Sequence, residues 1–190
     1  MDFIKKNKKL LIIIGIVVLI LGFFITKYNS LVLLNENVVA KESDIDVQLQ
    51  RRADLIPNLV NTVKGYIKHE KDVIDSVTSA REKLNSANTI EEKSEANKNL
   101  TSALNNLLVL VENYPELKAD TQFTALQDEL AGTENRIAVA RKDYNSAVTE
   151  FNKKIKLFPN NLLSGLFGFD SAAYFEVDQT AQGVPNVSIE

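Results

Sequence analysis

The chain has 190 residues and contains no cysteine, no tryptophan and a single histidine, His69. The absence of cysteine excludes disulfide bonds, thiolate catalysis, cysteine-ligated zinc and a lipid-modified cysteine. The histidine lacks the second histidine of an H-E-x-x-H motif, because Val73 stands at that position. Tyr66 stands three residues before it, so there is no E-x-x-H pair either. We therefore predict that His69 is a structural residue at the surface or half-buried.

Phosphate-binding and nucleophile motifs are absent as well. The sequence has no G-x-x-x-x-G-K-[ST], no G-x-G-x-x-G and no G-x-S-x-G. We therefore predict no catalytic residues, no metal ligands and no cofactor, and a protein that is not an enzyme. An enzyme that uses carboxylates or a metal between facing helices is the least favoured alternative.

One uncharged apolar run begins at Leu10 and ends at Thr26. At 1.5 Å per residue it spans roughly 25 Å, near the lower limit for a bilayer core of about 30 Å. Flanking lysines can extend to the headgroups, and Tyr28 stands where an interfacial aromatic is common. A cleaved signal peptide would look similar, but the end of the run has no A-x-A pattern. We predict an uncleaved transmembrane helix over residues 10–26, in contact with the lipid bilayer.

The charges are distributed unevenly. Four lysines lie within residues 5–9, whereas only Lys27 closely follows the apolar run. The positive-inside rule then predicts a single-pass membrane protein with a cytoplasmic N-terminus and the remaining domain outside. Of the 22 Lys and Arg and the 25 Asp and Glu residues, five and one lie in the first 27 positions, so the remainder carries a formal charge of about −7. An acidic domain argues against a nucleic-acid partner.

Residues 28–84 have apolar residues at every third to fourth position, which predicts helix. Pro57 interrupts this pattern, because it has no N–H and its ring crowds the carbonyl of Ala53. With Asp54 as an N-cap, Pro57 would instead lie in a first helical turn, where an N–H has no helical partner. The segment is therefore either one kinked helix or two helices.

Residues 85–88 are polar and predict a linker, and Thr89 with Glu92 has the spacing of a capping box at the start of the next helix. Tyr114-Pro115 should end that helix, since a residue before proline avoids the α region. Asp120 is expected to cap the last long helix.

The last long helix has an apolar residue at every seventh position and a mostly small residue three positions further on. The first set is Phe123, Leu130, Ile137, Tyr144, Phe151 and Phe158, and the second is Leu126, Thr133, Ala140 and Ala147. A seven-residue repeat predicts shallow-angle packing against neighbouring helices. An intramolecular bundle is favoured, and a coiled-coil dimer is the alternative. Pro159 should end the helix, and the apolar residues over 162–169 should pack back on the bundle, or less often contact lipid or a partner.

We thus predict an all-α fold with one N-terminal transmembrane helix followed by an antiparallel up-and-down bundle. The bundle has three long helices, or four if the chain breaks near Pro57. The expected organisation is a basic tail over residues 1–9, the membrane helix over 10–26, the helical domain over 28–175 and an irregular tail over 176–190.

Several stretches resemble the LemA family of bacterial membrane-anchored helical proteins. They are YNSLV at 28–32, DVQLQRRADLIPNLV at 46–60, ENYPELKA at 112–119, TENRIAVAR at 133–141, and FE and PNV near the C-terminus, at 175–176 and 185–187. The resemblance implies a short tail, one membrane helix and an antiparallel helical bundle, and it implies no catalytic activity. One departure is visible, since members commonly have a tryptophan shortly before the Asp46 motif and this chain has none.

Two short segments are crowded with polar side chains. They are Asp46, Arg51, Arg52 and Asp54 in one, and Glu134, Asn135, Arg136 and Arg141 in the other. They could form a composite polar site between two helices. The favoured interpretation is structural, with ion pairs and helix caps that fix the register of the helices, because the guanidinium group pairs well with carboxylates.

The leading functional hypothesis is a membrane-tethered, non-catalytic scaffold or adaptor of the LemA type, whose protein partners in the membrane or envelope are unknown. A self-assembling structural membrane protein, a homo-oligomer formed through the seven-residue repeat, is the alternative.

The orientation can be tested with one reporter, because the natural chain has no cysteine. We expect a Ser188→Cys variant to be labelled in intact cells by a membrane-impermeant maleimide, since the positive-inside rule puts the C-terminus outside. Labelling that appears only after lysis would show the opposite orientation.

Overall fold

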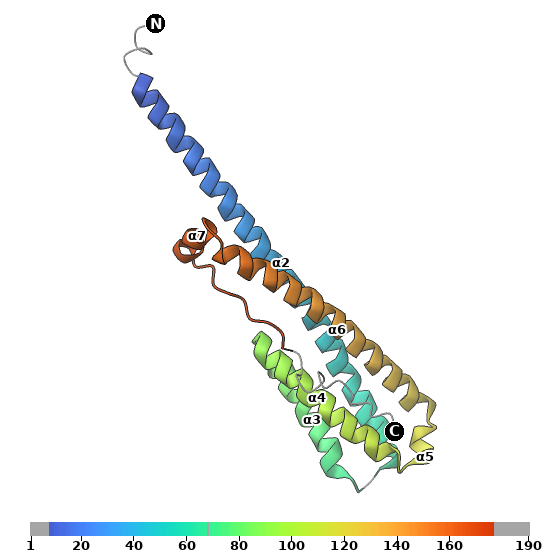
Figure 1. Ribbon diagram of the computed structural model, residues 1–190. Helices are drawn as coiled ribbons and strands as arrows, with labels where there is room; N and C mark the ends of the chain where they lie inside the picture. The colour runs from blue at the N-terminus through green and yellow to red at the C-terminus, as the bar shows by residue number, and fades with distance from the viewer. Residues whose placement is uncertain (1–7, 68, 177–190) are drawn as a thin grey trace, which may run out of the picture. The chain divides into compact units, whose positions relative to one another are not determined.

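The computed structural model describes residues 8–67 and 69–176, and within them it is all-helical, as predicted. Figure 1 shows the helices in chain order. They are α2 (Lys8–Tyr66), α3 (Lys71–Ser86), α4 (Ile90–Val111), α5 (Pro115–Lys118), α6 (Thr121–Lys156) and α7 (Asn160–Phe167). The predicted tails fall mostly outside the described residues, at 1–7 and 177–190.

The helices form two compact units. Unit 1 comprises residues 1–40 and 146–172, and unit 2 comprises residues 41–145 and 173–190. Both α2 and α6 contribute to each unit, because each is a single continuous helix that crosses the boundary. The apolar segment 10–26 is therefore the beginning of a helix that continues to Tyr66, with no break at Lys27.

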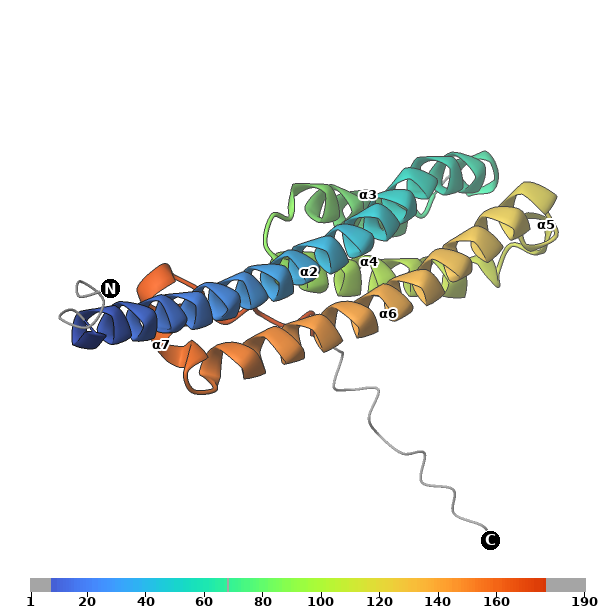
Figure 2. The same cartoon turned by 90° about the horizontal axis from the view of Figure 1, so that it is seen from above.

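Unit 2 contains the larger apolar core. Figure 2 shows α3 and α4 side by side, and their residues are in extensive contact. The largest fully buried side chains of this unit are Ile45, Ile56, Leu59, Val63, Leu100, Leu107, Leu117, Phe123, Ile137 and Phe175, and α3 adds the smaller Val77. The polar groups described below lie at the edge of this core.

Two predicted helix starts are confirmed. Thr89 accepts a hydrogen bond from the N–H of Glu92, and Glu92 accepts one from the N–H of Thr89, which completes the capping box of α4. Asp120 accepts from the N–H of Phe123 at 2.8 Å and so caps α6. This bond and a second one from the hydroxyl of Tyr66 lower the pKa of Asp120 below its usual range.

Of the two alternatives left open for Pro57, the structure shows the continuous helix, since Pro57 lies inside α2 and does not end it. Helix α2 continues through it to Tyr66, and the break comes at residues 67–70 instead, just after Gly65. Because Pro57 has no N–H, the carbonyl of Ala53 loses its helical partner. The guanidinium Nε of Arg81, on α3, donates to this carbonyl at 2.8 Å. A side chain from the neighbouring helix thus replaces the missing backbone hydrogen bond.

The seven-residue repeat of α6 is buried at five of its six predicted positions. Residues 123, 130, 137, 144 and 151 all have exposed fractions below a tenth. Phe158 is the exception, because α6 ends at Lys156 and its side chain is 80% exposed. The residue before a proline avoids the α region, so the helix cannot carry the repeat up to Pro159.

Two asparagines of α6 bind the extended segment that follows α7. In unit 1, the amide of Asn152 accepts from the N–H of Ala172 at 2.9 Å and donates to its carbonyl at 2.8 Å. In unit 2, Asn145 makes the same pair of bonds with Phe175, both at 2.9 Å. The N–H and carbonyl groups of Ala172 and Phe175 therefore have hydrogen-bond partners although no strand lies beside the segment.

The hydroxyl of Tyr144 adds a bond of 2.9 Å to the carbonyl of Ala173. Burial first, and then the charges of Glu42 and Glu91, raise the pKa of Tyr144 to about 12. The tyrosine is therefore protonated at neutral pH and donates this hydrogen bond.

The core position of Ile137 can be tested against a neighbour of similar shape. Ile137 is fully buried, whereas Val139, two residues further along α6, is 62% exposed. We expect Ile137→Ala to lower the free energy of unfolding by about 2–5 kcal/mol and Val139→Ala by about 0.5 kcal/mol or less. Urea denaturation of residues 28–190 measures both, and equal effects would contradict this assignment of the core.

Candidate binding groove

A buried arginine joins three helices of unit 2. Arg52 of α2 is 3% exposed, and its Nη1 lies 2.6 Å from Glu134 Oε2 of α6. The same nitrogen donates to Asn97 Oδ1 of α4, and Asn97 is itself buried. Burial lowers the pKa of Arg52, and the charge of Glu134 opposes that shift. An arginine remains protonated in proteins, so this is a buried cation held by one carboxylate and one amide.

A second cluster of charges lies on α2 and α4. Lys93 of α4 donates to Glu42 and Asp46 of α2, both at 2.9 Å. Burial alone would lower the pKa of Lys93, but its bonds to the two carboxylates outweigh burial and raise it. The side chain of Lys93 is only 12% exposed, and its ammonium group stays charged and pairs with both carboxylates.

The remaining polar residues predicted as a cluster are dispersed. Arg51 pairs with Glu129 at 2.9 Å, with both side chains about half exposed. Asp54 accepts from Gln50, and Arg136 donates to Gln48 at 3.2 Å. Asn135 and Arg136 also line a hollow of about 450 Å³ with Asp44 and Gln48. The predicted composite site is thus reduced to one pair, Arg52 with Glu134, whereas Asp46, Arg51, Asp54 and Arg136 contact other residues.

Sequence reasoning missed both contributions of α4. The sequence pattern does not mark Lys93 or Asn97 as a site residue. Asn97 does stand seven residues before Leu104, so it occupies a core position on an apolar helix face. A polar residue at such a position needs a buried partner. The spacing therefore predicts that Asn97 has a buried polar partner. It does not predict that the partner is Arg52, which is 45 residues away in the sequence.

Beside the buried arginine, unit 2 has an open groove of about 790 Å³. Most of its lining comes from α4, and α6 contributes Glu134 and Arg141. Asn97 and Glu134, the two partners of Arg52, both face it. Phe175 and Glu176 complete the wall, and the hydroxyl of Ser94 donates to the carbonyl of Glu176 at 3.3 Å.

The chemistry of the groove is polar and carries both signs of charge. Its carboxylates are Glu91, Glu95, Glu134 and Glu176, its cations are Lys98 and Arg141, and its amides are Asn97, Asn99 and Asn105. The hydroxyls of Thr101 and Ser102 donate to backbone carbonyls of the preceding turn, those of Asn97 and Lys98. Such a surface presents hydrogen-bond donors and acceptors along its length.

His69 lies outside this groove. It is exposed, in the turn between α2 and α3, as the sequence predicted. No group of three or more His, Cys, Asp or Glu side chains in residues 8–67 and 69–176 is arranged to hold a metal ion.

The fold and the groove define an all-helical protein with one long apolar N-terminal helix and a polar surface organised by a buried arginine. The chain belongs to the LemA family, whose profile matches residues 41–189. The resemblance noted in the sequence is thereby confirmed.

Relatives of the chain carry two names. Magnetosome protein MamQ 2 of Paramagnetospirillum magneticum is 26% identical over 84% of this chain and 68% of its own length. Magnetosome protein MamQ of Magnetospirillum gryphiswaldense is also 26% identical, over 86% and 71%. Protein LemA of Metamycoplasma hominis is 25% identical, over 85% and 76%.

Neighbouring arginines of α2 give a matched test of the buried ion pair. We expect Arg52→Ala to lower the free energy of unfolding by about 1–3 kcal/mol, because it leaves the buried amide of Asn97 without its donor, whereas water can reach the 41% exposed side chain of Glu134. Arg51→Ala should cost less than about 1 kcal/mol, since its pair with Glu129 is exposed to water. Urea denaturation at low and high salt measures both, and a cost for Arg51→Ala as large as that for Arg52→Ala would contradict this ranking.

Proposed function

We propose that the protein is a membrane-tethered, non-catalytic adaptor of the LemA type that binds a polypeptide partner in the groove along α4 and α6. The groove carries the proposal, because it is a hollow of about 790 Å³ that combines hydrogen-bonding groups with both signs of charge. Two of its lining residues, Asn97 and Glu134, are held by Arg52, which lowers the cost of ordering this part of the surface when a partner binds.

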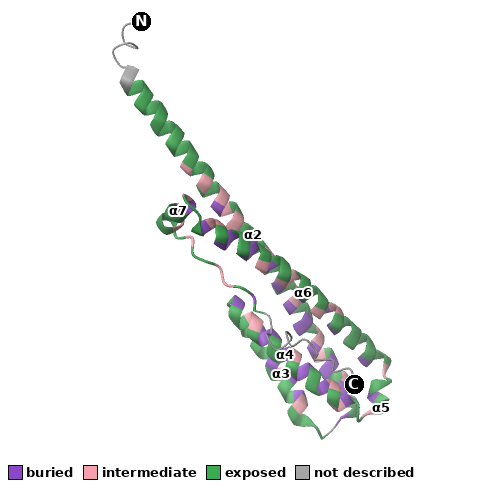
Figure 3. Ribbon diagram, viewed as in Figure 1, coloured by how far each residue is buried: buried purple, intermediate pink, exposed green. Residues whose placement is uncertain are grey.

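Tethering is supported by the N-terminal part of α2. Figure 3 shows this part exposed along its length, and the large apolar side chains from Leu10 to Ile25 are mostly about half exposed or more. By length and composition, α2 is the one helix in residues 8–67 and 69–176 that could cross a membrane, and a signal sequence would pass the same test. Apolar side chains of this number are costly in water, which favours insertion into lipid. The lysines within residues 5–9 favour a cytoplasmic N-terminus, with the groove and its partner outside.

Burial of the seven-residue repeat favours an adaptor over self-assembly. Phe123, Leu130 and Ile137 of α6 already pack in the core of unit 2, so they are not free to form a coiled-coil seam with a second copy. The hydroxyls of Thr101 and Ser102 in the groove are engaged with backbone carbonyls, which favours a binding role over a nucleophilic one.

Adjacent asparagines on α4 provide a matched pair for the test. Both Asn105 and Asn106 are exposed, but Asn105 lines the groove and Asn106 does not. With a photo-crosslinking phenylalanine analogue at either position in intact membranes, we expect a discrete crosslinked product from position 105 only. A second change, Ser102→Arg, should abolish that product, because it places a bulky cation in the groove.

Three results would contradict the proposal. Equal products from positions 105 and 106 would show that the groove has no special role, and a product of twice the mass of the chain would favour self-assembly. An undiminished product from a chain without residues 1–27 would remove the argument for tethering.

A further inference from the structure

The end of α6 and the helix α7 expose apolar side chains that the core does not use. Phe158 is 80% exposed and Leu166 is 74% exposed, and Leu157, Leu162 and Phe167 are each about half exposed. Leu163 points the other way and is 5% exposed. This segment, residues 157–169, is called the α6–α7 elbow below. It has one inward face and one broad apolar outward face.

The elbow has a defined structure. The amide of Asn160 donates to the carbonyl of Lys154 at 3.1 Å, and the hydroxyl of Ser164 donates to the carbonyl of Ile155 at 3.2 Å. Gly168 ends α7 in the left-handed conformation, with a φ of 73° that favours glycine. The outward face is therefore held in place by bonds to the end of α6.

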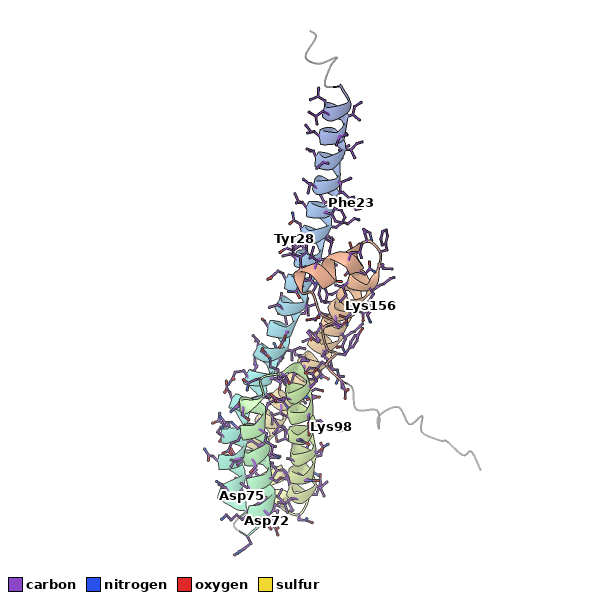
Figure 4. All side chains as sticks on the ribbon, turned by 90° about the vertical axis from the view of Figure 1, so that its left-hand side faces the viewer. Phe23, Tyr28, Asp72, Asp75, Lys98 and Lys156 are labelled. Carbon is purple, nitrogen blue, oxygen red and sulfur yellow. The ribbon has the colours of Figure 1, made fainter. Side chains whose placement is uncertain are left out.

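The elbow lies beside the apolar part of α2, within unit 1. Phe158 and Pro159 line a hollow of about 400 Å³ together with residues 19, 20, 23 and 24 of α2. The ring of Tyr28 lies 4.8 Å from that of Phe167 and 5.8 Å from that of Phe169. Figure 4 shows Tyr28 level with α7, and Phe23 further along α2 toward the N-terminus.

This placement fixes the depth of the elbow if residues 10–26 span the bilayer. Phe158 then lies alongside the last two turns of the membrane helix, at the depth of acyl chains. Phe167 and Tyr28 lie at the level of the headgroups, where aromatic rings are common. The outward face of the elbow continues the lipid-facing surface of α2.

Three lysines lie near the level at which the phospholipid headgroups would be, if residues 10–26 span the bilayer. Lys153, Lys154 and Lys156 occupy the last turn of α6, and Figure 4 shows Lys156 next to α7. The acidic residues of the same stretch are Glu150 and Asp170. Apolar side chains flanked by lysines are typical of segments that lie in the membrane interface, with anionic headgroups around the ammonium groups.

We propose that the α6–α7 elbow is a second membrane-contacting element, which inserts its apolar face into the leaflet on the Lys27 side of the bilayer and sets its lysines among the headgroups. The proposal rests on the proposed membrane insertion of residues 10–26. A phospholipid bilayer is the favoured occupant of this face, because the face adjoins a segment that would itself be surrounded by lipid.

The absence of tryptophan from the natural chain makes a direct measurement of depth available. Single-tryptophan variants of the full chain are reconstituted in vesicles of phosphatidylethanolamine and phosphatidylglycerol with brominated acyl chains, which quench tryptophan fluorescence on contact. Phe158→Trp and Leu166→Trp report on the elbow, and Leu19→Trp reports on α2. Leu33→Trp is the control, because Leu33 is as exposed as Leu166 but lies beyond Tyr28 on α2.

We expect Phe158→Trp to lose as large a fraction of its emission as Leu19→Trp, Leu166→Trp to lose a smaller fraction, and Leu33→Trp to lose almost none. All four positions are exposed, so folding is retained, and circular dichroism of each variant checks this.

Two other patterns would overturn the proposal and can be told apart. Quenching of Leu19→Trp without quenching of Phe158→Trp would leave the membrane helix in place and put the elbow in water. If the emission of Phe158→Trp is then also blue-shifted, a protein surface covers the elbow, either a second copy or a partner. Absence of quenching at both positions would reject the membrane helix of the proposed function as well.

Discussion

The structure of unit 2 depends on a buried positive charge. A guanidinium group cannot be removed from water unless a carboxylate and further acceptors meet it, because its desolvation costs several kcal/mol. Arg52 finds these groups on two other helices, at Glu134 of α6 and Asn97 of α4. Any shift of α2, α4 or α6 along its axis would separate them. The arginine therefore selects one register for three helices that apolar packing alone would hold less precisely.

Local rules account for what could be predicted. The caps at Thr89 and Asp120 depend on groups three residues apart, and the buried repeat of α6 depends on seven-residue spacing, so both are readable from the chain. The question left open at Pro57 and the error at Phe158 have the opposite cause. Whether a helix continues through a proline depends on a donor for the unpaired carbonyl, and here Arg81 of α3 supplies it. The seven-residue repeat stops before Phe158 because the backbone before Pro159 is sterically kept out of the helical conformation.

The groove could not be predicted, because its walls come from three parts of the chain. Charged residues of α6 were recognised as candidates, but the surface they share with α4 exists only after α4 docks. Phe175 reaches its place through Asn145, an amide that replaces a strand partner for an extended backbone. Side-chain amides that bind distant backbone leave no periodic pattern, whereas apolar helix faces do.

The contact between Arg81 and Ala53 makes the hydrogen bonding of α2 around Pro57 a property of the folded unit, not of the helix alone. A proline in an isolated helix leaves an unpaired carbonyl and a point of weakness four residues earlier. Here that carbonyl is bound by α3, so stiffness around Pro57 appears only when α3 is docked. Detachment of α3 would leave the same proline as a weak point near the C-terminal end of α2. One guanidinium group thus decides whether roughly the last three turns of α2 continue the helix stiffly or can bend away from it.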